Sequence, residues 1–202
     1  HGWFDKRFMY EESFRTPLLM RLPGGKKGDI PQLVQNIDYA PTFLELAGAP
    51  IPADIQGESL LPLLKGERPE NWRNSLYYHY YEYPAEHSVK RHYGVRDDRY
   101  KLIHFYNDID VWELYDLQED PHEMNNLYGK PSYEAVMKRM RDELYKLQKQ
   151  YDDPVGIRFI RSKLNWFGHH LKGKDYFQPV NEGSVTAYVY GENKYKIFKG
   201  CI

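Results

Sequence analysis

The chain is poor in cysteine, in net charge and in long apolar runs, and each shortage excludes a class of protein. Cys201 is the only cysteine among 202 residues, which excludes an internal disulfide and a cysteine-based metal cage. The formal net charge is -1, so a general attraction to nucleic acid or to an anionic membrane is not expected. No apolar run approaches the roughly 20 residues needed to span a bilayer. Any recognition of an anion is therefore expected to be local.

The beginning of the sequence also lacks an initiator methionine and a signal peptide. The chain opens instead on "HGWFDKRFMYEESFRTPLL", in which residues of both charges crowd among aromatic ones. We therefore expect the chain to be the back part of a larger enzyme, beginning next to its active site.

The first part of the chain has the order of predicted strands, turns and helix that is typical of an α/β domain. The run "TPLLMRLPGG" predicts a buried strand that ends in a turn, and "LVQNID" predicts a second strand. A helix is expected over residues 39–47, with Asp38 as its N-cap, Pro41 in its first turn and Gly48 at its end. The apolar "SLLPLL" in the following Pro- and Gly-rich stretch predicts a short anchoring turn.

The sequence changes character at Ser75, where tyrosine becomes frequent; the chain has 19 tyrosines in all. The segments "SLYYHYYEY", "VKRHYGVRD", "RYKLIHFY" and "VWELYDL" are of strand length and predict a small antiparallel sheet. Apolar residues at steps of three and four then predict a helix from Ser132 to about Gln150. A tyrosine-rich sheet suits a wet cleft wall or a contact surface, and equally an ordinary half-buried sheet.

Four blocks between residue 1 and about residue 150 carry a resemblance: "HGWFDKRFMYEESFRTPLLMRLPGG", "NIDYAPTFLELAGAPIPADIQGESLLPLLKG", "YGVRDDRYKLIHFY" and "WELYDLQEDPHEMNNL". In this order they resemble the C-terminal part of type I sulfatases, in the alkaline-phosphatase-like superfamily. The forms "FDKR" and "YYEYPAEHSVKRHYG" are most similar to the N-acetylglucosamine-6-sulfatase branch.

The resemblance implies an α/β fold, the C-terminal part of an alkaline-phosphatase-like fold with a small antiparallel four-stranded sheet plus helix subdomain. Residues 1–70 are expected to end the α/β catalytic domain, and residues 71–152 to form the sheet and helix subdomain. Residues 153–202 match nothing in the family. Their sequence indicates a tail of unknown role, with a basic amphipathic helix and a hairpin as candidates. His169 and His170 within this tail are adjacent, so they diverge and do not form a metal pair.

The resemblance also implies cofactors that this chain does not carry. The family's nucleophile is a formylglycine, made from Cys or Ser in a Cys/Ser-X-Pro-X-Arg motif near the N terminus, and no such motif occurs here. A calcium ion is expected with ligands upstream of this chain, and no metal ligand is assigned within it. We therefore expect the chain to need the N-terminal part of the same sulfatase, and to be inactive alone.

By the resemblance, Lys6 is the catalytic lysine that contacts the sulfate group and assists the leaving oxygen. Sulfuryl transfer requires charge neutralisation at the anion, for which an ammonium with three donors is suited. The alternative is a solvated lysine in a charged loop. Asp5 and Arg7 flank Lys6 and are proposed as sugar contacts, since a carboxylate and a guanidinium together bind vicinal hydroxyls; a surface ion pair is the alternative.

His92 follows "HSVKR" at the start of a strand and is the candidate for a further sugar hydroxyl contact, because loops on a rigid scaffold set selectivity. An ordinary structural histidine is the alternative. Glu11, Glu12 and Arg15 are expected to be structural, with a Glu-Arg pair that fixes the course of the loop.

These expectations define a carbohydrate sulfatase that removes a 6-O-sulfate from N-acetylglucosamine of a glycosaminoglycan or mucin glycan. The resemblance implies a sulfated glycan as substrate and a periplasmic, secreted or lysosomal location. One alternative is a phosphoester hydrolase of the same superfamily. Another is a non-catalytic glycan-binding or interaction module, which would bind glycan without hydrolysing it.

Overall fold

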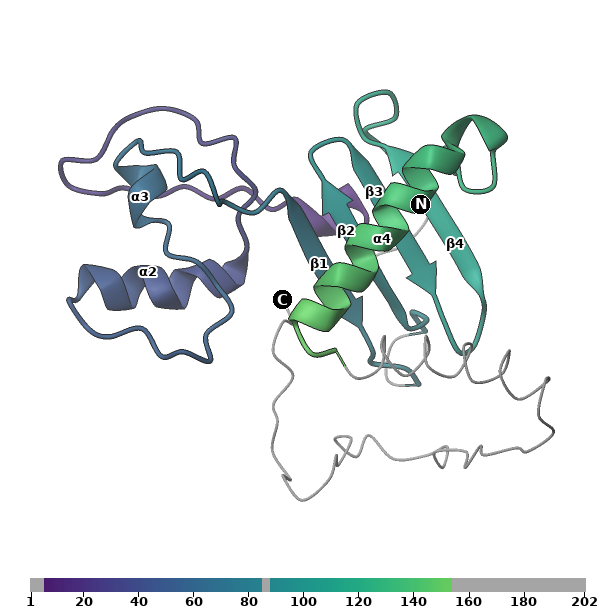
Figure 1. Cartoon of the computed structure of the whole chain (residues 1–202), viewed down its shortest axis with the longest axis horizontal. Coiled ribbons are helices and arrows are strands. Elements are labelled where there is room, and N and C mark those ends of the chain that lie inside the picture. Colours follow the sequence, from purple (N-terminus) through teal and green to yellow (C-terminus); the bar gives the residue numbers. More distant parts are fainter. Residues whose placement is uncertain (1–5, 85–87, 154–202) are drawn as a thin grey trace, which may run out of the picture. The chain divides into compact units, whose positions relative to one another are not determined.

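The computed structural model describes residues 6–84 and 88–153 (Figure 1). The chain up to Leu144 packs as one compact unit, and a second unit begins at Tyr145. Asp5 and residues 154–202 of the tail predicted for 153–202 lie outside the described residues, and the predicted domain boundaries stay predictions. Among the residues described, no helix is long and apolar enough to cross a membrane.

Short helices dominate the first part of the chain. They are α1 (Glu11–Phe14), the 3-10 helix η1 (Asn36–Asp38), α2 (Tyr39–Leu46) and α3 (Leu61–Leu64). The predicted helix is confirmed as α2, and Gly48 ends it in the left-handed region with φ 67°. The predicted anchoring turn is confirmed as α3, whose Leu63 and Leu64 pack with Leu60 in a buried cluster.

Two strands were predicted before α2, and both predictions are wrong: within the described residues, neither segment is a strand. "TPLLMRLPGG" has no regular structure, and its Leu19 is 95% exposed. "LVQNID" is irregular until it enters η1. An apolar run becomes a strand only when another strand pairs with its backbone, and the one sheet among the described residues is formed later in the chain.

Asp38 stands at the predicted N-cap of α2, but its side chain does not cap that helix. The carboxylate is buried and accepts hydrogen bonds from the backbone N–H groups of Gln35 (2.7 Å) and Glu58 (2.9 Å). Arg73 binds both carboxylate oxygens, at 2.5 and 2.7 Å. Asp38 therefore caps η1 through Gln35 and also joins the loop at Glu58 to Arg73, just before β1; this second, long-range role is not revealed by a capping pattern.

The predicted antiparallel sheet is confirmed. Its strands are β1 (Ser75–Tyr80), β2 (His92–Asp97), β3 (Tyr100–Phe105) and β4 (Val111–Asp116). Neighbours in sequence are neighbours in the sheet, in the order β1-β2-β3-β4. Tyr80 pairs with His92, and His92 pairs in turn with Phe105. Because successive side chains alternate between faces, these three aromatic rings share one face.

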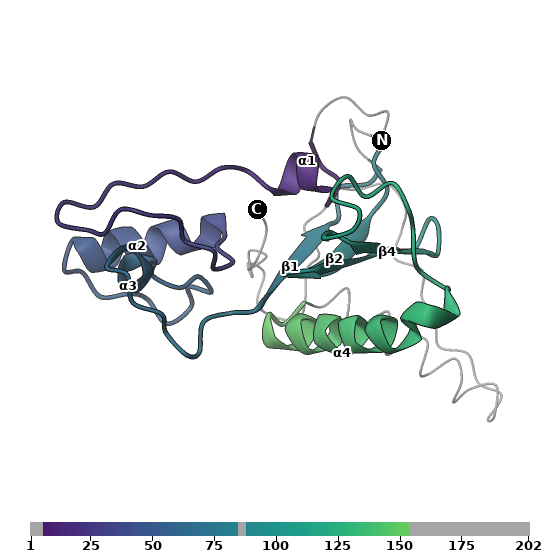
Figure 2. The same ribbon diagram turned by 90° about the horizontal axis from the view of Figure 1, so that it is seen from above.

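One face of the sheet is covered by α4 (Glu134–Gln150), which follows the 3-10 helix η2 (Pro131–Tyr133) and confirms the predicted helix. Its Glu143 accepts a 2.7 Å hydrogen bond from the Ser75 hydroxyl. Arg139 Nη1 lies 2.6 Å from a carboxylate oxygen of Asp97. Figure 2 shows this helix on the side of the sheet opposite α1.

The other face is covered by the N-terminal segment. Met9 is buried in a cluster with Ile103, Phe105 and Tyr115. Gly94 makes this approach possible, because a Cβ there would lie 2.5 Å from the Met9 sulfur. The segment that begins at Lys6 is thus held by the tyrosine-rich sheet rather than by α2 and α3.

The outer edge of β4 is occupied by the loop that follows the strand. The Asn126 side chain accepts from the Leu114 N–H at 3.0 Å and donates to the Trp112 carbonyl at 3.0 Å. The Leu127 N–H donates to the Leu114 carbonyl at 2.8 Å. Three backbone groups in the middle of this edge strand are therefore satisfied by the loop.

Candidate functional site

The predicted site residues begin on the segment that crosses the sheet. Lys6 is exposed, Arg7 is half-buried, and Asp5 lies just before the described residues. Tyr78 donates a 2.7 Å hydrogen bond to the Arg7 carbonyl, and Arg7 Nη1 donates to the Lys6 carbonyl at 3.0 Å. The main chain beside Lys6 is thus held, while the lysine side chain is accessible.

Arg7 also lies in the electrostatic environment of Tyr80. Burial and the Glu82 carboxylate raise the pKa of the Tyr80 hydroxyl, and the Arg7 guanidinium partly offsets this by lowering it. Tyr80 itself donates to Glu82 at 3.4 Å. The charges of Arg7 and Glu82 therefore both act on the Tyr80 hydroxyl at the end of β1, with opposite effects on its pKa.

His92, at the start of β2, lies inside a cage of aromatic rings. Its ring centroid is 4.9 Å from that of Phe105, 5.4 Å from Tyr80 and 5.7 Å from Phe8. The imidazole is fully buried, and this burial lowers its pKa to about 4. His92 is therefore neutral near pH 7.

The tautomer of His92 follows from its one hydrogen bond. Nδ1 lies 2.8 Å from the Lys90 carbonyl oxygen, which can only accept, so Nδ1 carries the proton. Nε2 is then an acceptor, and it is buried with no hydrogen-bond partner in the part of the chain that the structure describes. An orphaned buried acceptor is uncommon in folded proteins.

The structure brings Arg7 and His92 close together, although 85 positions separate them in the sequence. Phe8 follows Arg7 directly and stacks on His92, with ring planes 23° apart. Lys6 precedes Arg7, so three of the four predicted residues belong to one region of the molecule. Their roles toward a substrate stay predictions.

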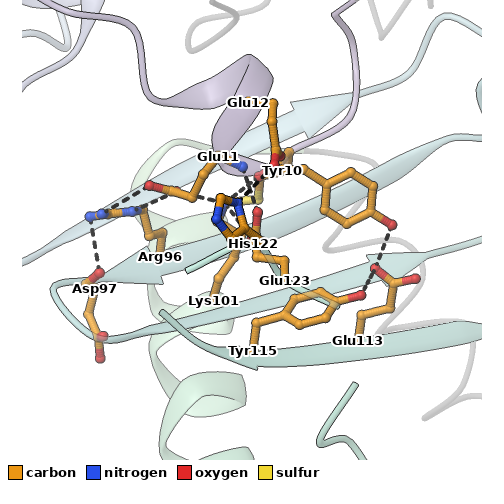
Figure 3. A network of polar contacts seen from close by, with 11 residues as sticks. Tyr10, Glu11, Glu12, Arg96, Asp97, Lys101, Glu113, Tyr115, His122 and Glu123 are labelled. Carbon is orange, nitrogen blue, oxygen red and sulfur yellow. Dashed lines mark hydrogen bonds and ion pairs between the residues drawn. The ribbon is translucent and has the colours of Figure 1, made fainter. Parts of the chain in front are cut away.

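A buried ion network lies under the same segment, behind α1 (Figure 3). Lys101 Nζ is 2.8 Å from Glu11 Oε1 and 2.7 Å from Glu123 Oε1. Arg96 Nε donates to Glu11 Oε1 at 3.1 Å. Glu11 therefore has the structural role expected of it, but its arginine partner is Arg96 of β2 and not Arg15 of its own segment, which is exposed.

The two carboxylates of this network differ in their electrostatics. Burial would raise the pKa of Glu11, but Lys101 and Arg96 outweigh it and hold that pKa below its usual value. Burial dominates at Glu123 and raises its pKa despite Lys101. Close by, Glu113 accepts from Tyr10 at 2.9 Å and from Tyr115 at 3.1 Å, and burial raises its pKa as well.

Sequence reasoning missed Lys101 and Glu123. Lys101 had a detectable signal, since it alternates with the apolar Ile103 and Phe105 along its strand, and a buried lysine is rare unless paired. Glu123 had none, because it stands in the polar loop "EDPHEMNNL". Its partner is identified only by the folded sheet.

The described residues do not supply a metal centre. Within 6–84 and 88–153, no three side chains of the types that ligate metals are grouped to hold an ion. Lys101 and Arg96 also make the acidic residues of the ion network unsuitable, since cations already neutralise them.

Short helices followed by a four-stranded antiparallel sheet, with the segment that carries Lys6 across one face of that sheet, are the fold of the C-terminal part of a sulfatase of the alkaline-phosphatase-like superfamily. The family model described as "N-sulphoglucosamine sulphohydrolase, C-terminal" matches residues 1–150, and the chain belongs to this family.

Individual relatives agree with this assignment. The chain is 57% identical over 157 residues to an N-acetylglucosamine-6-O-sulfatase of Bacteroides thetaiotaomicron, covering 76% of this chain and 28% of that protein. The solved structure of BT4656 in complex with its substrate D-glucosamine-2-N,6-O-disulfate superposes with a TM-score of 0.70 at 55% identity. This match covers 76% of the chain and 32% of that structure.

A more distant match is a phosphonate monoester hydrolase of Silicibacter pomeroyi, with a TM-score of 0.56 at 28% identity. It covers 64% of the chain and 28% of that structure. The chain thus spans roughly three tenths of the length of each of these three relatives. The likeness confirms both the fold and the predicted family.

Proposed function

We propose that the protein containing this chain is a carbohydrate sulfatase that hydrolyses the 6-O-sulfate of N-acetylglucosamine in a glycosaminoglycan or mucin glycan. The observation that carries the proposal is the 57% identity with an N-acetylglucosamine-6-O-sulfatase. The accessible Lys6, beside a main chain held by Tyr78, supports it from the structure.

In this proposal Lys6 neutralises the sulfate group and the charge that develops on the leaving oxygen. An ammonium can do both, because its three donors rotate freely about the end of a flexible stem. Asp5 and Arg7 flank it and bind hydroxyls of the sugar ring, the carboxylate accepting and the guanidinium donating.

His92 is proposed as the acceptor for one further sugar hydroxyl. Its orphaned Nε2 supports this role, because a hydroxyl donor would satisfy it. The ring is buried, so contact requires the sugar to reach Nε2 between the aromatic rings of the cage. The neutral tautomer keeps Nε2 an acceptor over the neutral pH range.

The remaining machinery is proposed to come from the N-terminal part of the same sulfatase. That part would supply a formylglycine nucleophile and the calcium ligands, for which the described residues offer no set. Exposed apolar side chains support such a partner: Leu19 and Phe43 are 95% and 60% exposed. A periplasmic, secreted or lysosomal location is proposed with it.

The test is made on the full-length sulfatase, with 6-O-sulfated N-acetylglucosamine as substrate and sulfate release as the readout. Lys6→Ala is expected to lower kcat by about a hundredfold or more, since it removes a charge aimed at the transition state. Lys138→Ala, on the exposed face of α4, is the matched control and should leave kcat unchanged. A wild-type kcat in Lys6→Ala would remove the catalytic role of Lys6.

A phosphoester hydrolase is the second candidate, favoured by the 34% identity over 142 residues to the multifunctional alkaline phosphatase superfamily protein PehA of Trinickia caryophylli. Parallel assays with a phosphate and a sulfate ester of the same sugar separate the two. Faster cleavage of the phosphate ester would overturn the sulfatase assignment, and binding without any cleavage would indicate a glycan-binding module.

A further inference from the structure

Lys101 is the centre of the ion network and touches the N-terminal segment at two points. Its side chain is 0% exposed. Nζ donates to the Met9 carbonyl at 2.6 Å and pairs with Glu11 at 2.8 Å and with Glu123 at 2.7 Å. The ammonium is thus tied to the Met9 carbonyl by a hydrogen bond and lies between two carboxylates, so its position on the sheet is restricted from three sides (Figure 3).

Glu123 reinforces the same attachment from its loop. Its Oε2 accepts a 2.6 Å hydrogen bond from the Glu11 N–H. Its backbone is left-handed, with φ 54°. This conformation is uncommon for a residue with a side chain and costs free energy that the surrounding contacts must offset. The carboxylate is thus held in place from both its backbone and its side chain.

A short covalent path leads from these contacts to Lys6. The Met9 carbonyl binds Lys101, the Met9 side chain fills the space above Gly94, and the Arg7 carbonyl binds Tyr78. Lys6 is three residues from Met9, about 10 Å of extended chain. If Met9 shifts on the sheet, Lys6 is therefore expected to shift with it, because only two residues lie between them.

We propose that Lys101 and Glu123 are positioning residues of the sulfatase reaction, which fix Met9 and Glu11 on the sheet and so place Lys6 and Arg7 at the sulfate ester. The inference rests on the proposed function, which gives Lys6 and Arg7 their substrate. A buried ion network is a poor way to gain stability alone, because apolar groups of equal volume often do as well. Its directed hydrogen bonds fix the register of the segment, which apolar packing does less strictly.

The test separates position from stability. Lys101→Met alone leaves the buried Glu123 carboxylate without its cation, while Glu11 keeps Arg96, and is expected to destabilise the protein. The deciding variant is therefore Lys101→Met/Glu123→Gln in the full-length sulfatase, in which the Gln oxygen still accepts the Glu11 N–H. We expect an unfolding midpoint close to wild type, with kcat lowered by about tenfold to a hundredfold. A folded double variant with wild-type kcat would overturn the proposal.

Glu123→Gln alone is the second variant, needed if the double variant does not fold. It keeps the contacts of Lys101 with Met9 and Glu11 and should lower kcat less than the double variant. Its wild-type kcat would count against the proposal in the same way. Lys138→Met/Asp142→Asn is the matched control, because that 2.6 Å pair is 75% and 61% exposed; both its kcat and its midpoint should be unchanged.

A double-mutant cycle with Lys6→Ala tests whether the network acts through Lys6. If it does, the loss of kcat caused by Lys101→Met/Glu123→Gln shrinks when Lys6 is already absent. An equal loss in both backgrounds contradicts action through Lys6.

Amide hydrogen exchange keeps this inference distinct from the proposed function. Residues 7–11 should exchange faster in the double variant than in wild type, whichever ester the enzyme cleaves. Unchanged exchange overturns the attachment itself, whereas a failed sulfatase assay with faster exchange overturns the proposed function.

Discussion

The Tyr78 hydroxyl donates a hydrogen bond of 2.7 Å to the Arg7 carbonyl, across 71 positions of sequence. A tyrosine of the sheet thereby holds the main chain next to the proposed catalytic lysine. The aromatic richness of β1 thus has a structural use in this region, since Tyr78 also packs against the ring of Phe14 at 5.5 Å.

Tyr78→Phe removes this hydrogen bond and keeps the ring. We expect the free energy of unfolding to fall by about 1 kcal/mol, the usual net value of one hydrogen bond, and kcat of the full-length enzyme to fall several-fold. Urea unfolding and steady-state kinetics measure the two effects. Tyr39→Phe, in the leucine cluster around α3, is the control for removing a hydroxyl elsewhere, and an equal loss of kcat there would contradict the prediction.

His92 predicts a pH dependence of stability. Its folded pKa of about 4 lies below the ordinary value of 6.5, so between these values the unfolded chain binds a proton that the folded chain does not. The stability linked to His92 is therefore complete above about pH 6.5 and is lost as the pH falls toward about 4. Between about pH 7.5 and about pH 5 the loss is expected to be about 2 kcal/mol.

His92→Phe keeps an aromatic ring in the cage and removes the titration. Urea unfolding at both pH values should show a smaller loss for this variant than for wild type. Acidic groups with lowered pKa values, such as Glu11 and Asp116, add a slope of the same sign, but they are present in both proteins. Identical pH slopes would show that His92 is not the titrating group.

Gly94→Ala tests the close approach of the segment to the sheet. The new Cβ would lie 2.5 Å from the Leu102 carbonyl oxygen and 2.5 Å from the Met9 sulfur. We expect a loss of about 1–3 kcal/mol in unfolding free energy, as for overpacked cores, with a fall in kcat because Met9 is displaced. Gly48→Ala is the control: its Cβ meets nothing within 4 Å, so it should cost stability through its left-handed backbone but spare kcat.

Arg73→Leu tests the buried carboxylate of Asp38. The variant leaves Asp38 without its only cationic contact among the described ion pairs. The free energy of unfolding should fall by about 3–5 kcal/mol, as when one partner of a buried pair is removed. Lys138→Met breaks an exposed pair and should cost less than about 1 kcal/mol. Similar losses in the two variants would show that Asp38 is solvated in the protein.

The sheet and α4 could be predicted from sequence because their signals are local. Alternating aromatic and β-branched residues mark β1 to β4, and a period of three and four marks α4. The runs at "TPLLMRLPGG" and "LVQNID" carry the same apolar signal but are irregular here. Such a run becomes a strand only if another strand pairs with its backbone, and the residues of the run do not specify that partner.

The sequence predicted which residues belong to the candidate site, but not how they are arranged in space. The charge around Lys6 drew attention to the segment, and the resemblance gave Lys6, Asp5, Arg7 and His92 their expected roles. The attachment through Lys101 and Glu123 was not predictable, because it joins residues 22 positions apart whose contact depends on the register of β3 and β4. The cage around His92 likewise depends on the register that pairs it with Tyr80 and Phe105.

Asn126 has an effect beyond its own loop. Its amide occupies both the N–H of Leu114 and the carbonyl of Trp112, which removes these two groups from the ladder that a foreign chain could extend. Replacing it by alanine would expose the Leu114 N–H and the Trp112 carbonyl, the kind of unpaired edge to which another strand can add.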